Sequence, residues 1–282
     1  MNRRGFLAGL AAAPFAARAV MLNDYAAGGV FDMSAALRDG PVTLLAQEYE
    51  CLSFKLRTGD YISGFGTRSR LLTDYTQGPF ITVEDPSQFT DGVILRDFDI
   101  VATAKGGAGQ HGIWMPSCRE WRVSNIMRRG EIGGVGWGMY GQRDEGGLNP
   151  GDSTRNIFDG VGSVYARINW YLGGNIDNPR IRGGTSNMNR LARCLGYGAE
   201  IDNLQIMQGA GNVVEQFISS TPRNNGITLA WYGNKIRDAV VERSGGWGIF
   251  GTTHDEQHDN VIDSPHNGGN QGSGFISPSL TQ

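Results

Sequence analysis

The sequence predicts an all-β protein: a single-stranded, right-handed parallel β-helix of roughly ten coils with a short N-terminal capping helix. The first observation is a near repeat, because NIDNPRIRGG at 175–184 returns 25 residues later as EIDNLQIMQG at 200–209. Both copies are short, rich in isoleucine and closed by glycine, which is typical of one turn of a stacked β-coil. The second observation is the content of 43 glycines, which with 10 prolines and no collagen-like period indicates frequent tight turns.

The spacing of other strands supports a coil of this length. Leu95 and Trp121, which open two strands of alternating polarity, are 26 residues apart, and Ile236 and Val261 are 25 apart. At about 25 residues a coil, the chain after its first nineteen residues would form roughly ten coils, which would stack ~4.8 Å apart. In each repeat strand we expect the two Ile to face the core and the Asn to stack on an Asn of the next coil.

Three segments are expected along the chain. Residues 1–19 contain paired arginines in MNRRGFL, an apolar run and the small-x-small site Ala17-Arg18-Ala19, which together resemble a bacterial twin-arginine signal peptide. Residues 20–40 are expected to form an N-terminal cap, with one short helix over 30–37 predicted by the spacing of Phe31, Ala35 and Leu37. Residues 41–282 are expected to form the β-helix.

The export signal predicts a periplasmic or secreted protein. Its apolar run is shorter than the ~20 residues that span a bilayer, so we expect no membrane association after signal removal. The net charge of −3 gives no indication of a nucleic-acid partner. Cys51, Cys118 and Cys194 are too widely separated for a disulfide framework or a CxxC metal site, and we expect them to be buried.

A second type of strand begins with glycine. Its members are Gly112–Met115, Gly136–Tyr140, Gly226–Leu229, Gly248–Phe250 and Gly274–Ile276. If Ile113, Met139, Leu172, Ile227, Leu229 and Ile249 point inward, alternation turns Trp114, Tyr140, Tyr171, Thr228 and Phe250 outward.

Aromatic rings in a row suit sugars, so the candidate substrate-binding residues are His111, Trp114, Tyr140, Tyr171 and Phe250. The alternative is that Trp137, Trp170 and Trp231 fill the coil and the other rings are scattered surface residues. The insertion at 141–156 is a candidate cleft wall or contact loop.

Titratable side chains concentrate near the C-terminus. The candidate catalytic residues are His254, Asp255, Glu256, His258 and Asp259, with Arg143 and Glu215 elsewhere in the chain. Glycoside hydrolysis would need two of the carboxylates, whereas a lyase would need a base and a cation that neutralises a uronate. The cluster can equally supply metal ligands or be a solvated polar turn. The cofactor therefore stays open, with calcium as the candidate.

The segment from residue 30 to 72 resembles the N-terminal part of pectate-lyase-like right-handed parallel β-helix proteins. The resemblance lies in a helix followed by G-x-V-x-L, Y, L-x-L, G-x-x-I-x-G-x-G and S-x-L. It implies a carbohydrate-active protein of the lyase, hydrolase or epimerase type, with its glycan along the glycine-led strands. His111 in GQHGI is similar to the G-H-G-I element of polygalacturonase-type hydrolases, but that family's N-T-D, Asp-Asp and R-I-K elements are absent.

Other classes of function remain open at this point. A non-enzymatic glycan-binding adhesin or phage-tailspike-like receptor-binding protein would use the same aromatic face without cleaving its ligand, and a purely structural solenoid is a third interpretation. The expected partner is a polysaccharide or bacterial glycan. A monomer is expected, or a trimer if the protein is tailspike-like.

Overall fold

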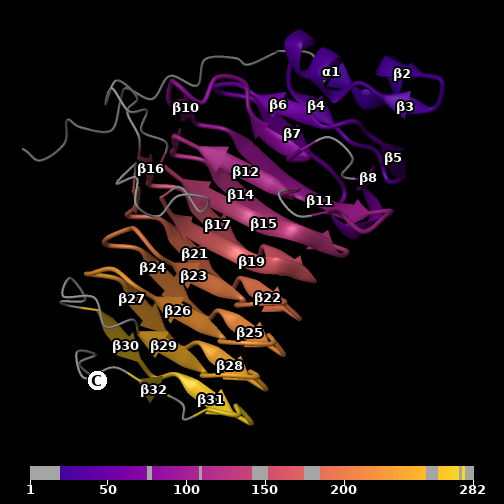
Figure 1. Ribbon diagram of the computed structural model, residues 1–282. Helices are drawn as coiled ribbons and strands as arrows, with labels where there is room; N and C mark the ends of the chain where they lie inside the picture. The colour runs from indigo at the N-terminus through magenta and orange to yellow at the C-terminus, as the bar shows by residue number, and fades with distance from the viewer. Residues whose placement is uncertain are drawn as a thin grey trace, which may run out of the picture.

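The computed structural model describes residues 20–74, 78–107, 110–141, 152–174, 185–251, 260–272 and 275–276. They form a parallel β-helix whose coils stack in chain order from the N-terminal cap to the C-terminal strands (Figure 1). The predicted fold class is confirmed. The expected signal peptide lies outside the described residues. Among the described residues, no helix is long and apolar enough to cross a membrane.

One face of the coil is a nine-stranded parallel sheet. Its strands are β6 (Phe54–Leu56), β9 (Ile81–Val83), β12 (Ile113–Pro116), β15 (Ile132–Tyr140), β19 (Ala166–Gly173), β23 (Leu204–Ile206), β26 (Ile227–Leu229), β29 (Ile249–Gly251) and β32 (Phe275–Ile276). All five glycine-led strands lie in this sheet, as the shared motif predicted. Glycine is needed there because a Cβ on Gly112 would lie 2.6 Å from the carbonyl oxygen of Gly136 in the next coil.

The other two faces belong to a 17-stranded sheet, which divides into two stacks joined by the long strands β11 (Ile94–Ala102) and β14 (Arg122–Arg129). We call the first stack the repeat face. Besides the first halves of β11 and β14, it contains β1 (Val20–Met21), β4 (Val42–Thr43), β7 (Tyr61–Ser63), β17 (Ile157–Asp159), β21 (Arg190–Ala192), β24 (Val213–Glu215), β27 (Lys235–Arg237) and β30 (Val261–Asp263).

The second stack, the third face of the coil, takes the other halves of β11 and β14. Its remaining strands are β5 (Glu48–Glu50), β8 (Arg70–Thr73), β18 (Gly162–Val164), β22 (Leu195–Tyr197), β25 (Ile218–Ser220), β28 (Val240–Glu242) and β31 (His266–Gly268). A short four-stranded sheet precedes the repeat face in the chain, with β10 (Thr90–Asp91), β13 (Cys118–Arg119), β16 (Ser153–Thr154) and β20 (Ser186–Asn187).

Between the repeat face and the third face, the chain bends at one residue with a left-handed backbone. These residues recur coil after coil as Asp97, Asn125, Gly160, Arg193, Gln216, Asp238 and Ser264, with φ between 48° and 64°. Only one of them is glycine, although positive φ is uncommon for other residues. The strands before and after each bend pair in parallel with the neighbouring coils, and these pairs fix the backbone conformation of the bend. Arg193, Gln216 and Asp238 are exposed at their bends.

The coil interior is packed with apolar side chains from all three faces. The residues predicted to point inward from the glycine-led strands are buried there: Ile113, Met139, Leu172, Ile227, Leu229 and Ile249. Trp137 and Trp170 also stack inside the coil, with ring centroids 5.6 Å apart and planes at 14°, while Trp231 is only half-buried. All three cysteines are free and buried, as predicted.

A ladder of buried asparagines runs along one corner of the coil. The Nδ2 of Asn156 donates to Oδ1 of Asn189 at 2.9 Å, Asn189 donates likewise to Asn212 at 3.1 Å, and Asn212 donates to Asn234 at 3.0 Å. The backbone N–H of Asn234 then donates to Oδ1 of Asn260 at 2.8 Å. The ladder pairs buried polar groups with one another from coil to coil.

The predicted Asn stacking is found at a second corner as well. Nδ2 of Asn169 donates to Oδ1 of Asn203, in the second copy of the near repeat, at 2.7 Å. Both side chains are fully buried.

The predicted helix over 30–37 is displaced toward the C-terminus. Helix α1 spans Met33–Asp39, and Asp32 caps it because its Oδ1 accepts the Ala35 N–H at 2.8 Å. Val30–Phe31 is instead strand β3, which pairs antiparallel with β2 (Ala26–Ala27). The 3-10 helices η1 (Leu22–Tyr25) and η2 (Gly66–Arg68) complete the helical residues in the described ranges.

The predicted alignment of the repeats is wrong in part. EIDNLQIMQG contains β23 of the nine-stranded sheet and is not a repeat-face strand, while NIDNPRIRGG lies outside the described residues. Leu95 pairs with Val123 and not Trp121, and Ile236 pairs with Ile262 and not Val261. The reason is variable coil length, because successive asparagines of the ladder are 33, 23, 22 and 26 residues apart.

Candidate functional site

Most of the predicted catalytic residues fall outside the described residues. These are Arg143, His254, Asp255, Glu256, His258 and Asp259. The remaining one, Glu215, ends strand β24 on the repeat face. In the part of the chain that the structure describes, no group of three or more His, Cys, Asp or Glu is arranged to hold a metal ion.

The predicted aromatic residues do lie outside the main core: Trp114, Tyr140, Tyr171 and Phe250 on the nine-stranded sheet, and His111 just before its strand β12. His111 stacks on Trp114 with centroids 4.2 Å apart and planes at 14°, and Trp114 contacts Tyr140 at 4.0 Å. The Tyr171 hydroxyl donates to the Gly174 carbonyl at 3.0 Å. Trp114 and Tyr171 are only 9% and 4% exposed, because they pack with Val135 and Ile168 in a second apolar cluster. They therefore offer little surface to a sugar, whereas His111, Tyr140 and Phe250 are half-buried.

Asp202 lies before strand β23 of the same sheet and is buried. Its carboxylate accepts hydrogen bonds from Gln205 Nε2 at 2.9 Å, Asn224 Nδ2 at 3.0 Å, the Asn225 N–H at 2.8 Å and Thr228 Oγ1 at 2.7 Å. Four donors from two successive coils satisfy this carboxylate. Asp202 therefore connects two successive coils.

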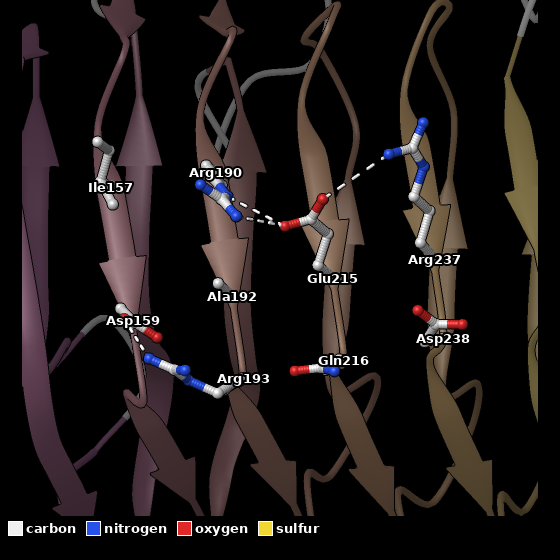
Figure 2. Close-up of a pocket in the computed structure, with 9 residues that line it drawn as sticks. All are labelled: Ile157, Asp159, Arg190, Ala192, Arg193, Glu215, Gln216, Arg237 and Asp238. Atoms are coloured by element: carbon white, nitrogen blue, oxygen red, sulfur yellow. Dashed lines mark hydrogen bonds and ion pairs between the residues drawn. The ribbon is translucent and has the colours of Figure 1, made fainter.

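The repeat face carries a hollow of about 420 Å³ across β17, β21, β24 and β27 (Figure 2). We call it the arginine hollow. It is lined by Ile157, Asp159, Arg190, Ala192, Arg193, Glu215, Gln216, Arg237 and Asp238. Of the predicted site residues, the hollow contains Glu215 alone.

Strand alternation places these side chains outside the coil. In each three-residue strand the central residue is buried, as Leu191, Val214 and Ile236 are, so the flanking residues face solvent. The parallel register then sets Asp159, Ala192, Glu215 and Arg237 in one row along the helix axis. Ala192 is the smallest member of this row, so space remains above it between Asp159 and Glu215.

Each of these two carboxylates holds an arginine from β21 or the bend that follows it. Arg190 donates to Oε2 of Glu215 through Nε at 3.1 Å and Nη2 at 2.7 Å. Arg193 donates through Nη2 to Oδ2 of Asp159. Figure 2 shows the two arginines extending in opposite directions on either side of Ala192. Arg237 approaches Glu215 more loosely, with Nη1 3.9 Å from Oε1.

The arginines are more exposed than the two carboxylates with which they pair. The side chains of Arg190, Arg193 and Arg237 are 56%, 66% and 47% exposed, against 39% for Asp159 and 26% for Glu215. The Oδ1 atom of Asp159 is buried and has no hydrogen-bond partner among the described residues.

This arrangement allows two kinds of chemistry. Three guanidinium groups and an amide can bind a polyhydroxyl or anionic ligand. Two carboxylates on either side of an open space can also serve as the acid and base of glycoside hydrolysis.

Sequence reasoning missed Asp159, Arg190, Arg193 and Arg237. Each belongs to a three-residue strand with a buried centre and polar flanks, or to the bend after it, as in IFDG, RLAR, VVEQ and KIRD. Aligning these four segments by the buried central residue would have brought the four residues together. Alignment by a constant period of 25 residues does not, because the coils differ in length.

No family model matches this sequence, and no curated protein matches it. Solved structures do share its fold. Tailspike protein 2 from Escherichia coli O157:H7 bacteriophage CAB120 aligns with a TM-score of 0.59 at 12% identity, covering 90% of this chain and 38% of the phage protein. The enzymatically active domain of tailspike protein 2 from bacteriophage CBA120 aligns with a TM-score of 0.57 at 13% identity, covering 90% and 43%.

The Agl-KA catalytic domain aligns with a TM-score of 0.52 at 13% identity, covering 89% of this chain and 51% of that domain. This chain thus spans about two fifths to one half of the length of these proteins. At such low identity the likeness concerns the fold.

Proposed function

We propose that this chain is an exported carbohydrate-active β-helix protein that binds a polysaccharide at the arginine hollow. The observation that carries the proposal is the lining of the hollow, where carboxylates, guanidinium groups and an amide surround a space beside Ala192. Sugar hydroxyls both donate and accept hydrogen bonds, so such a mixed lining suits them. The nine-stranded sheet, where the glycan was expected, offers less exposed aromatic surface to a sugar, because Trp114 and Tyr171 are buried.

The fold is consistent with this proposal. Two of the similar structures are phage tailspike proteins, one of them described as an enzymatically active domain, and the third is a catalytic domain. Fold alone does not determine function, so binding has to be measured on this chain.

The test is a binding screen of the protein on neutral and acidic polysaccharides by affinity electrophoresis and calorimetry. Arg190→Ala should lower the affinity for the ligand that binds best about tenfold, because it removes a donor of charge-assisted hydrogen bonds. Asp263→Asn is the matched control, since Asp263 neighbours Arg237 in the same row but does not line the hollow. The proposal fails if no polysaccharide binds, or if Arg190→Ala binds as tightly as the control.

Hydrolysis is the second candidate function, favoured by the positions of Asp159 and Glu215. They lie two strands apart with Ala192 between them, so their backbone positions are about 10 Å apart. An inverting reaction needs the two carboxyl groups about 6.5–9.5 Å apart, a separation that side chains on backbones this far apart can adopt. Asp159→Asn and Glu215→Gln should then lower kcat about 10²–10⁴-fold while weakening binding no more than about tenfold.

Two product assays decide between hydrolysis and the other candidate activities. New reducing ends without ultraviolet absorbance indicate hydrolysis, and an unsaturated uronate indicates a lyase. Turnover that survives both substitutions in the hollow would place catalysis elsewhere, and Asp255→Asn and Glu256→Gln would then test the C-terminal cluster. Binding without any product would identify a glycan-binding adhesin or tailspike-like receptor, for which light scattering should detect a trimer.

A further inference from the structure

We propose that the arginine hollow selects one anionic group on the glycan, a carboxylate or a sulfate, and that Arg237 is the residue that binds it. This inference rests on the proposed function, because it names the chemical class of the ligand that the hollow takes. It is carried by the hydrogen bonds that the three arginines make and by the donors they leave unused.

The first step concerns what a ligand meets on approach. The side chains of Arg190, Arg193 and Arg237 are more exposed than the carboxylates of Asp159 and Glu215 that pair with them. A ligand that enters beside Ala192 therefore contacts these guanidinium donors before it contacts the carboxylates of Asp159 and Glu215. Guanidinium groups bind carboxylate and sulfate oxygens with two parallel hydrogen bonds where the geometry allows.

The second step separates the three arginines by how their donors are used. Arg190 donates hydrogen bonds to Glu215 through Nε and Nη2, and Arg193 donates one to Asp159 through Nη2. Arg237 comes within 3.9 Å of Oε1 of Glu215, which is an ion pair but lies beyond hydrogen-bond distance. In the described part of the chain, Arg237 thus keeps its planar set of donors for a ligand.

The third step is the role of the acids. Glu215 fixes Arg190 and Asp159 fixes Arg193, so these two guanidinium groups are held in place before a ligand arrives, while Glu215 attracts Arg237 only loosely. Holding a flexible side chain in advance reduces the entropy that binding costs. Glu215 and Asp159 are positioning residues in this scheme.

The charges of the hollow limit what it selects. Arg190, Arg193 and Arg237 are opposed by Asp159, Glu215 and Asp238, so the lining has no net charge. A single anionic group can pair with Arg237, whereas a densely charged polymer would bring further anions against the three carboxylates. The expected ligand therefore carries one acidic group per two or more sugars, which separates it from a polymer that is charged on every sugar.

The experiment uses matched pairs of polymers that differ only in charge. Gellan and hyaluronan supply carboxylates and are compared with their carboxyl-reduced forms; κ-carrageenan supplies sulfate and is compared with its desulfated form. The full chain should bind at least one charged polymer about tenfold more tightly than its neutral counterpart, and the preference should fall as salt is raised. The pair that shows the preference identifies the anionic group.

The Arg237 variants complete the test. Arg237→Gln should abolish the preference, so that the charged and neutral members of the pair bind with equal affinity, and Arg237→Lys should keep only part of it, because lysine lacks the planar pair of donors. Arg243→Gln is the control, since Arg243 pairs with Glu242 on the third face, outside the hollow.

The possible results separate this inference from the proposed function. Equal binding of the charged and neutral members of every pair would overturn the anionic selection and leave polysaccharide binding intact. A preference that persists in Arg237→Gln would overturn the assignment of Arg237. If no polymer binds, charged or neutral, both this inference and the proposed function fail.

Discussion

Arg190 reaches from one coil to the next and donates two hydrogen bonds to a single carboxylate oxygen of Glu215, at 3.1 and 2.7 Å. Both side chains are partly exposed, so water screens the pair and its contribution to stability is below about 1 kcal/mol. The pair orients Arg190 over the hollow, and we expect its effect on ligand binding to exceed its effect on folding.

Glu215→Gln tests this expectation. The variant should unfold within about 2–4 °C of the parent protein, because little stability is lost, yet bind the polysaccharide ligand up to about tenfold more weakly. Calorimetry measures both quantities on the same sample. A large loss of stability with unchanged affinity would show that the pair serves the fold alone.

The asparagine ladder should be essential to the fold. Asn189→Ala removes a side chain that accepts from Asn156 and donates to Asn212 at 3.1 Å and to Ser186 Oγ at 3.0 Å, all of them buried. Each partner left unsatisfied costs about 1–3 kcal/mol, so the free energy of unfolding should fall by about 3 kcal/mol or more. Urea unfolding measures the change, with Gln271→Ala, which truncates an exposed amide side chain, as the control. A loss similar to that of the control would contradict the role of the ladder.

Two tryptophans distinguish the coil interior from its surface. Trp170 is fully buried, stacks on Trp137 and donates its Nε1–H to the Leu195 carbonyl at 2.9 Å, whereas Trp231 is half-buried. Trp170→Ala should lower the free energy of unfolding by about 3–5 kcal/mol, and Trp231→Ala by about 1 kcal/mol. Equal effects in denaturant titrations would contradict this assignment.

The three cysteines predict a loss of stability at alkaline pH. Burial raises the pKa of the Cys51, Cys118 and Cys194 thiols from 9.0 to about 12. Between these values the unfolded chain releases its thiol protons while the folded chain keeps them, so the free energy of unfolding falls as pH rises. The folded protein should also resist thiol reagents at pH 8 and react fully in urea.

Cys118→Ala provides the control for the pH effect. Removing one buried thiol should make the dependence of unfolding on pH less steep between pH 9 and 12, even though the smaller side chain lowers stability at neutral pH. An unchanged slope would show that other groups cause the alkaline loss.

Much of the fold could be predicted from local patterns. At Gly112, Gly136 and Gly226, which lead three of the glycine-led strands, the backbone of the next coil approaches too closely for a Cβ, and that requirement is visible in the sequence as repeated glycine. The inward residues of these strands, such as Ile113 and Ile249, followed from alternation. The burial of the cysteines followed from their isolation.

The sites were less predictable. Burial of Trp114 and Tyr171 depends on their packing with Val135 and Ile168 across the strands β12, β15 and β19, which no local pattern indicates. The predicted cluster from His254 to Asp259 lies outside the described residues, so its role stays a prediction.

The sequence by itself determined that this chain forms a β-helix, because glycine spacing, alternation and strand length are local properties of each coil. Only the tertiary structure decided which residues of successive coils are aligned with one another. The coil between Asn156 and Asn189 is longer than the coils that follow, and this difference sets the register that brings Asp159, Ala192 and Glu215 into one row. The arginine hollow exists because that register places a small alanine between two carboxylates, each of which holds an arginine.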